Sequence, residues 1–319
     1  MAESSPEPSS GTSWERDALE RLARAALDEQ RRARRWGIFF KSLTFLYLFI
    51  LLFVFLGLLG GKERALPGRH TALVEINGVI AADSDASADR VNAGLQEAFK
   101  DKNTAGVILR VNSPGGSPVQ ANQISQEMRR LRGLHPKVPL YVVVDDVCAS
   151  GGYYVAAAAD RIYVDQASIV GSIGVLMDGF GFTGTMDKLG VERRLLTAGD
   201  NKGFLDPFSP LLQEQREYAQ KLLSEIHRQF IDTVRQGRGE RLREVPELYS
   251  GLIWTGAQSI ELGLADELGS VDYVAREVIK AEHVVDFSAR ESIAERFARR
   301  LGAAMAQTLV RQTSGPQLR

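Results

Sequence analysis

The decisive stretch of this 319-residue chain is DVCASGGY, residues 146–153. It follows an apolar run, Leu140–Val144, typical of a buried strand, and it precedes a helix-prone run, Tyr154–Ala159. A serine between a strand and a helix can present its hydroxyl at the helix N-terminus, where free N–H groups and the macrodipole stabilise a developing oxyanion. Ser150 is therefore a candidate nucleophile. From this octapeptide alone, the alternative is that Ser150 only caps the helix.

A second strand–loop–helix unit lies upstream. The strand-like run VILRV (107–111) leads into the turn NSPGGSP (112–118), and a helix-like stretch follows from Val119 to Arg132. Pro114 fixes one φ angle, and the paired glycines allow φ values that other residues resist, so backbone N–H groups can point into a cleft. The turn can serve as an oxyanion hole, or it can be only a tight connection. Its pairing with Ser150 on the next unit favours the first interpretation.

The chain offers few proton acceptors for a serine nucleophile, which needs a base. None of its four histidines sits in a glycine-rich turn or beside these motifs: His70, His135, His227 and His283. His70 directly follows a membrane segment, His135 lies in a loop, and we expect a surface role for His227 on a long helix. A Ser–His–Asp triad is therefore disfavoured.

Lysine is the other candidate base, provided that burial lowers its pKa enough to leave it neutral. The candidate is Lys202 in TAGDNKGFLDPF (197–208), a stretch that follows a strand-like run starting at Val191. Apolar neighbours in sequence, Phe204, Leu205 and Phe208, can desolvate it. From the residues alone, the alternative is a solvated loop lysine.

Four motifs in order carry a resemblance to a known family. They are NSPGG (112–116), ASGGYY (149–154), VGSIGV (170–175), and KG (202–203) ahead of PF (207–208). Together they resemble the signal peptide peptidase A (SppA) family of membrane-bound Ser–Lys proteases. The similarity spans roughly Ala72 to Ala281 and includes GLADELG (263–269). It implies an α/β fold of the ClpP/crotonase type, a superhelix of βα units with a mostly parallel sheet.

The resemblance also implies roles for particular residues. Ser150 would be the nucleophile, Lys202 the general base, and Ser172 the serine that orients the lysine, while Gly115 and Gly151 would offer the oxyanion N–H groups. The separation of the dyad, 202 − 150 = 52 residues, suits the short, single-repeat members, in which both residues lie in one catalytic unit. Two neighbouring acids oppose this assignment, because a close carboxylate would keep the lysine charged: Asp200 and Asp206. Cys148 is expected to be a small core residue.

An uncharged segment at 42–61, about 20 residues, is long enough to cross a bilayer as one helix. More cations precede it (Arg21, Arg24, Arg31, Arg32, Arg34, Arg35, Lys41) than follow it (Lys62, Arg64, Arg69). The positive-inside rule then predicts a single-pass protein with a cytoplasmic N-terminus and the catalytic domain on the other side. Together with the family resemblance, this implies the bacterial inner membrane and a periplasmic catalytic domain. The alternative is a cleaved signal peptide, but the approach of about 40 residues is too long for one.

These features divide the chain into five parts. They are a cytoplasmic tail with an Arg-rich juxtamembrane helix (1–41), the anchor (42–61), a linker (62–71), a Ser–Lys protease domain (72–286) and a basic amphipathic C-terminal helix (287–319). Within the protease domain, strand-like runs alternate with helix-like segments, which indicates βα units and a mostly parallel sheet. These runs are 72–76, 106–111, 138–144, 162–164 and 191–196, and a long helix is expected over Pro210–Gln236.

The resulting hypothesis is a membrane-anchored endopeptidase that degrades signal peptides and other membrane-derived peptides. The resemblance further implies a ring-like homo-oligomer, an octamer in the short form. No cofactor or metal is expected, because the chain lacks a P-loop and a His/Cys cluster with metal-ligand spacing. The net charge of −1 argues against a nucleic-acid partner. A crotonase-type acyl-CoA enzyme and a non-catalytic scaffold on the same fold are the alternatives.

Overall fold

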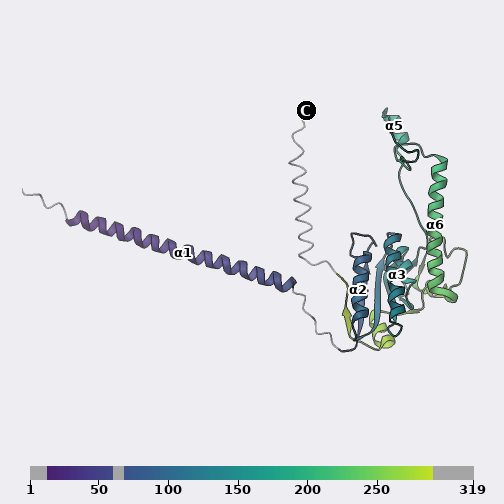
Figure 1. The fold of residues 1–319 in the computed structure, drawn as a ribbon, viewed down its shortest axis with the longest axis horizontal. Helices are drawn as coiled ribbons and strands as arrows, with labels where there is room; N and C mark the ends of the chain where they lie inside the picture. Colours follow the sequence, from purple (N-terminus) through teal and green to yellow (C-terminus); the bar gives the residue numbers. More distant parts are fainter. Residues whose placement is uncertain (1–12, 60–67, 290–319) are drawn as a thin grey trace, which may run out of the picture. The chain divides into compact units, whose positions relative to one another are not determined.

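The computed structural model describes residues 13–59 and 68–289, and these belong to two separate units (Figure 1). The first unit contains helix α1 (Ser13–Leu59), whose 47 residues give a length of about 70 Å at 1.5 Å per residue. Within the stretch Leu27–Val54, a window of 18 residues has a mean hydropathy of 2.2, so this helix is by length and composition apolar enough to cross a membrane. The expected N-terminal apolar helix is thus confirmed. The predicted anchor at 42–61 overlaps this stretch, and its last two residues lie outside the described ranges.

The second unit is built on a mixed, mostly parallel sheet. Its central strands are β1 (His70–Asn77), β2 (Thr104–Ser113) and β3 (Leu140–Ala149), and the main path runs β6-β5-β3-β2-β1-β8. The shorter strands are β4 (Arg161–Val164), β5 (Ile169–Gly171), β6 (Ile253–Thr255), β7 (Glu267–Leu268) and β8 (Val284–Asp286). Only the β5–β6 pair is antiparallel among the described strands. The predicted α/β class with a mostly parallel sheet is confirmed.

Strand β3 has different neighbours along its length, and this split shapes the site. Its first half pairs with β4 through Tyr141–Val143, whereas its last residues, Val147–Ala149, pair with β5. The β4–β5 connection therefore passes from one half of β3 to the other, next to the end of the strand. The result places Gly171, the last residue of β5, opposite Ala149, the residue before Ser150.

The two faces of the sheet are covered unequally. Side chains alternate along β2, so Leu109 points into the larger core while Ile108 points to the other face. Three helices pack on the first face: α2 (Ala88–Lys100), α3 (Pro118–Leu134) and α4 (Gly151–Ala156). The second face carries a smaller cluster under α8 (Val271–Tyr273) and the π-helical segment η2 (Val274–Ile279). The same unit contains the short segments η1 (Gly239–Arg241) and α7 (Gly256–Glu261).

Residues 175–212, which we call the arm, leave the sheet after β5 and return into α6 (Gln213–Arg238). The arm carries α5 (Thr183–Leu189), which lies at the outer end of α6, away from α2 and α3 (Figure 1). Aromatic contacts hold it together: the Phe182 and Phe208 rings stack at 5.4 Å between centroids. The predicted long helix is confirmed, since α6 covers nearly the expected range.

Four of the five predicted strands are confirmed by β1, β2, β3 and β4, but the fifth is wrong. The run 191–196 forms no strand and lies in the arm, where Leu196 is 96% exposed. Its three apolar side chains, Val191, Leu195 and Leu196, are all exposed, and the other three residues are charged. The predicted C-terminal helix at 287–319 falls almost wholly outside the described residues.

Candidate active site

Ser150 stands at the junction between β3 and α4, as the sequence predicts. It is half-buried, occupies the residue before the first turn of α4, and has φ 50° and ψ −122°. Positive φ is strained for a residue with a side chain and costs roughly 1–3 kcal/mol, so the surrounding contacts must hold it. Its own backbone N–H donates to the carbonyl of Gly171 at 2.8 Å, which ties the serine to the end of β5.

The glycine turn after β2 packs directly against this junction. Gly115 has φ +104°, and a Cβ added there would lie 2.7 Å from both the Gly151 nitrogen and Ser150 Cβ. The backbone of Gly115 therefore occupies space that any side chain would need. The structure thus brings the NSPGG turn and the serine of the next βα unit together, as the pairing of the two motifs predicts.

The backbone N–H groups near Ser150 are not equally available. The Gly115 N–H donates to Ser113 Oγ at 3.1 Å, so it is engaged in this structure. The next amide, that of Gly116, has no hydrogen-bond acceptor within the described residues, and its nitrogen would lie 3.2 Å from a Cβ built on Gly151. Gly151 is the first residue of α4, and the first N–H groups of a helix lack intrahelical acceptors. Gly116, which sequence reasoning missed, and Gly151 are therefore the free amides beside Ser150.

Ser172 follows β5 in a tight turn beside the nucleophile. Its φ is +51°, its N–H donates to the carbonyl of Leu252 at 2.8 Å, and its own carbonyl accepts from the Gly174 N–H at 2.9 Å. Only glycine fits at position 171, because its φ is +109° and an added Cβ would lie 2.9 Å from the Trp254 ring. The structure therefore places Ser172 one residue from the carbonyl that binds the Ser150 backbone.

Lys202 lies apart from this group, in an exposed turn of the arm. Within the described part of the chain, no hydrogen bond joins it to Ser150 or Ser172. The neighbouring Asp206 bonds elsewhere, accepting from Ser209 Oγ at 2.6 Å and from Arg193 Nε at 3.3 Å. The Ser209 hydrogen bond and then the contacts of Phe208 and Arg193 lower the pKa of Asp206. In a single copy of the chain, Lys202 is solvated and Asp206 is paired with Arg193.

Other candidate residues of the sequence have different environments. Cys148 is fully buried, as expected, and burial raises the pKa of its thiol, so the thiolate is disfavoured. His70 is buried and stacks on Phe287, and the His135 ring packs at a tilt against Phe99. The expected surface role of His227 is wrong, because its ring is half-buried and Nε2 lies 3.1 Å from the carbonyl oxygen of Ile173.

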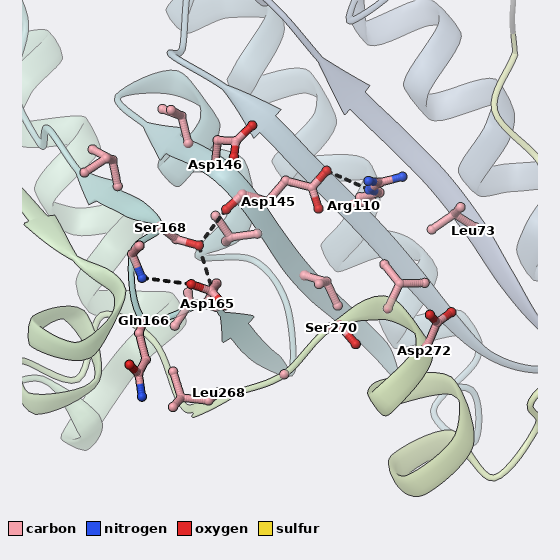
Figure 2. A pocket seen from close by; sticks show the side chains of 18 of the residues that line it. Leu73, Arg110, Asp145, Asp146, Asp165, Gln166, Ser168, Leu268, Ser270 and Asp272 are labelled. Carbon is pink, nitrogen blue, oxygen red and sulfur yellow. Dashed lines mark hydrogen bonds and ion pairs between the residues drawn. The ribbon is translucent and has the colours of Figure 1, made fainter.

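A cavity of about 1080 Å³ opens on the second face of the sheet, and Ser150 is not among its lining residues (Figure 2). Arg110 lines this cavity, and its Nε–H donates to the Asp145 carboxylate at 2.7 Å. Ser168 Oγ donates to the Asp145 carbonyl at 2.5 Å and accepts from the Asp165 N–H at 3.0 Å. These bonds fix the β4–β5 connection, which delivers Ser172 to the site. Among the described residues, no group of three or more His, Cys, Asp or Glu side chains is arranged to hold a metal ion.

A serine at a helix N-terminus, beside two free backbone amides at the ends of parallel strands, is an arrangement typical of serine hydrolases. Comparison with known proteins narrows this class. Residues 133–285 match the model of peptidase family S49. The chain is 31% identical to a putative protease of Synechocystis sp. over 202 residues, covering 63% of this chain and 70% of that protein. The chain therefore belongs to peptidase family S49, which supports a serine protease.

Two further relatives match a similar length of this chain. A putative signal peptide peptidase SppA of Enterococcus faecium is 31% identical over 215 residues, covering 65% of this chain and 62% of that protein. A protein of Brucella melitensis named Na(+)/H(+) antiporter NhaA is 43% identical over 223 residues, covering 66% of this chain but 30% of that protein. The chain thus spans less than two thirds of either relative's length.

Proposed function

We propose that this chain is a membrane-anchored serine endopeptidase in which Ser150 is the nucleophile and Lys202 the general base. The observation that carries the proposal is the convergence of three separate loops on Ser150. The Gly115–Gly116 turn packs on it, α4 begins at it, and the Ser172 turn accepts its backbone N–H. Convergence of this kind supplies both a positioned hydroxyl and oxyanion donors.

The chemistry follows from these groups. Ser150 Oγ attacks the carbonyl carbon of a peptide bond, while its proton passes to the neutral amine of Lys202. The carbonyl oxygen becomes an oxyanion that the Gly116 and Gly151 amides stabilise. The lysine then gives the proton to the leaving amine, and an acyl-enzyme remains. A water molecule, deprotonated by the same lysine, releases the carboxylic acid and restores the serine.

The arm delivers Lys202 to Ser150 when it packs against a second copy of the chain. In one copy, the arm exposes large apolar side chains, including Leu176 at 79%, Phe180 at 80% and Leu196 at 96%. Exposed apolar side chains in such number are typical of an interaction site. Packing would bury these side chains together with Lys202 and remove the lysine from water. This supports the homo-oligomer that the family resemblance implies.

A mixing experiment tests this arrangement. The Ser150→Ala and Lys202→Ala variants, each of which we expect to be inactive alone, are coexpressed in equal amounts. If serine and lysine come from neighbouring copies of a ring, roughly a quarter of the sites regain both groups, because each is intact with a chance of one half. If the arm folds onto its own domain, or inserts into the membrane instead, no activity returns.

The substrate class rests on the anchor. An endopeptidase tethered by one apolar helix meets peptides that lie in or leave the membrane, such as cleaved signal peptides, and we assign these as substrates. The Arg-rich flank before the helix assigns the N-terminus to the cytoplasm and the catalytic unit to the opposite side. A periplasmic reporter fused after Arg69 should be active, and one fused after Arg35 should be inactive. The reverse result would exclude this substrate pool.

A further inference from the structure

We propose that His227 is a positioning residue of this site, which holds the turn 171–174 and, through it, both Ser172 and the backbone of Ser150. The inference rests on the proposed function, because it assigns a role within that site. His227 is half-buried on the side of α6 that also carries the buried Phe230.

Packing against the core holds the part of α6 around His227 in place. One turn later, Phe230 is buried and packs against the Tyr154 ring of α4 at 5.2 Å between centroids. Val234, one turn further, is fully buried in the main core. The half of α6 that begins near His227 is thus anchored to the same short helix that starts at Ser150.

From this anchored position the imidazole reaches the turn of Ser172. Nε2 lies 3.1 Å from the carbonyl oxygen of Ile173, and Ile173 itself is fully buried. Because a carbonyl only accepts, the ring must donate its Nε2–H. That nitrogen cannot serve as a base while the bond exists, so His227 acts on the site through the turn rather than on the substrate.

The turn needs such support because its backbone is strained. It also carries the carbonyl of Gly171, which accepts the N–H of Ser150. Ser172 has φ +51°, which persists only where neighbouring contacts hold it. The other bonds of the turn are between backbone groups: Ser150 N–H to Gly171 at 2.8 Å, Ser172 N–H to Leu252 at 2.8 Å, and Gly174 N–H to Ser172 at 2.9 Å. His227 contributes the one bond from a side chain to this turn within the described residues.

The location of the bond gives it a second consequence. Directly after Gly174 the chain enters the arm, and the arm returns to the body through α6. The His227–Ile173 bond therefore joins the outgoing segment to the returning helix at the base of the arm. The bond thus holds the turn of Ser172 at the point where the chain leaves for the arm.

The test compares three variants of the full chain in detergent. His227→Gln keeps an N–H donor near the Nε2 position, His227→Leu removes it, and His135→Leu is the control for losing a half-buried histidine elsewhere. We expect His227→Leu to lower kcat by about 10- to 100-fold with little change in KM, as small misplacements of catalytic groups do. His227→Gln should stay within about threefold of the parent and His135→Leu unchanged in kcat, by the same reasoning. Added to Ser172→Ala, His227→Leu should cause a smaller further loss than it causes alone, because only its support of the Ser150 backbone is then left to lose.

Hydrogen exchange gives a readout that does not depend on catalysis. The amides of Ser150 and Ser172 should exchange faster in His227→Leu than in the parent, and not in the two other variants. Full kcat in His227→Leu, an equal loss in His227→Gln, or a loss that multiplies with Ser172→Ala would each overturn the inference. A Ser150→Ala variant that still cleaves peptides, with exchange changed as expected, would instead refute the proposed function and leave the role of His227 in the turn intact.

Discussion

Replacing Gly115 by alanine should disable the site through two separable effects. A Cβ at this position would lie 2.7 Å from the Gly151 nitrogen, 2.7 Å from Ser150 Cβ and 2.9 Å from the Ala149 carbonyl oxygen. The residue also has φ +104°, which alanine rarely adopts. Backbone strain and overpacking each cost roughly 1–3 kcal/mol, so the free energy of unfolding should fall by about 2–6 kcal/mol. For a domain of this size, Tm should fall by about 5–20 °C.

Two other glycines separate these effects. Gly78 has φ +83° but nothing within 4 Å of an added Cβ, so Gly78→Ala introduces strain alone. Gly133 lies in α3 with open space around it, and Gly133→Ala should raise stability by about 0.5–1 kcal/mol through helix propensity. Thermal unfolding and peptide cleavage at 25 °C are measured on all three variants in detergent.

The expected pattern is specific to the contact with Ser150. Gly115→Ala should lose cleavage by about 100-fold or more, even at temperatures where it is folded, because its Cβ pushes between the serine and the oxyanion amide. Gly78→Ala should lose stability but keep its activity. If Gly115→Ala and Gly78→Ala cleave peptides at similar rates, the packing of the glycine turn against Ser150 does not contribute to catalysis.

Three further predictions follow from other residues. Ser150→Ala and Lys202→Ala should each abolish cleavage, and the double variant should be little worse, as expected for groups that act as one unit; activity in Lys202→Ala would make Lys188 the next lysine to test. Cys148, buried with a raised pKa, should resist a thiol reagent in the folded protein at pH 8 and react after unfolding. Burial raises the pKa of Asp266, but hydrogen bonds and charge from Arg238 outweigh it and lower the pKa overall. Asp266→Asn should therefore cost about 3 kcal/mol near pH 7, and this difference in unfolding should shrink as the pH falls below about 4, through the lowered pKa of the folded state.

The sequence predicts the parts of this site that depend on local chain geometry. A buried strand followed by small residues and a helix positions Ser150, and the same pattern positions the Gly115 turn. Adjacent parallel strands end at the same edge of the sheet, so the two loops had to meet there. The order of β2 and β3 in the sheet makes this contact, as the motifs indicate.

The residues that the sequence missed depend on contacts between distant segments. The amide of Gly115 is engaged by Ser113, and no pattern distinguishes it from the amide of Gly116. Sequence reasoning assigns His227 to the surface, although it precedes the buried Phe230 and Val234 by three and seven residues, because its partner is a backbone carbonyl 54 positions away that the sequence does not reveal. The run 191–196 fails as a strand because Val191, Leu195 and Leu196 are exposed on the arm rather than buried in the sheet, and the sequence alone does not separate these two outcomes. Lys202 is the remaining case, since its neighbours in one copy of the chain do not include the serine.

The central claim is that Ser150 is an activated nucleophile, and covalent labelling tests it most directly. The full chain in detergent is treated with a fluorophosphonate that reacts with activated serines, and the modified peptide is mapped by mass spectrometry. The account predicts one label, on Ser150, that is absent from Ser150→Ala and strongly reduced in Lys202→Ala. Peptide cleavage that continues while Ser150 stays unlabelled, or a label on another serine whose loss abolishes cleavage, would contradict it.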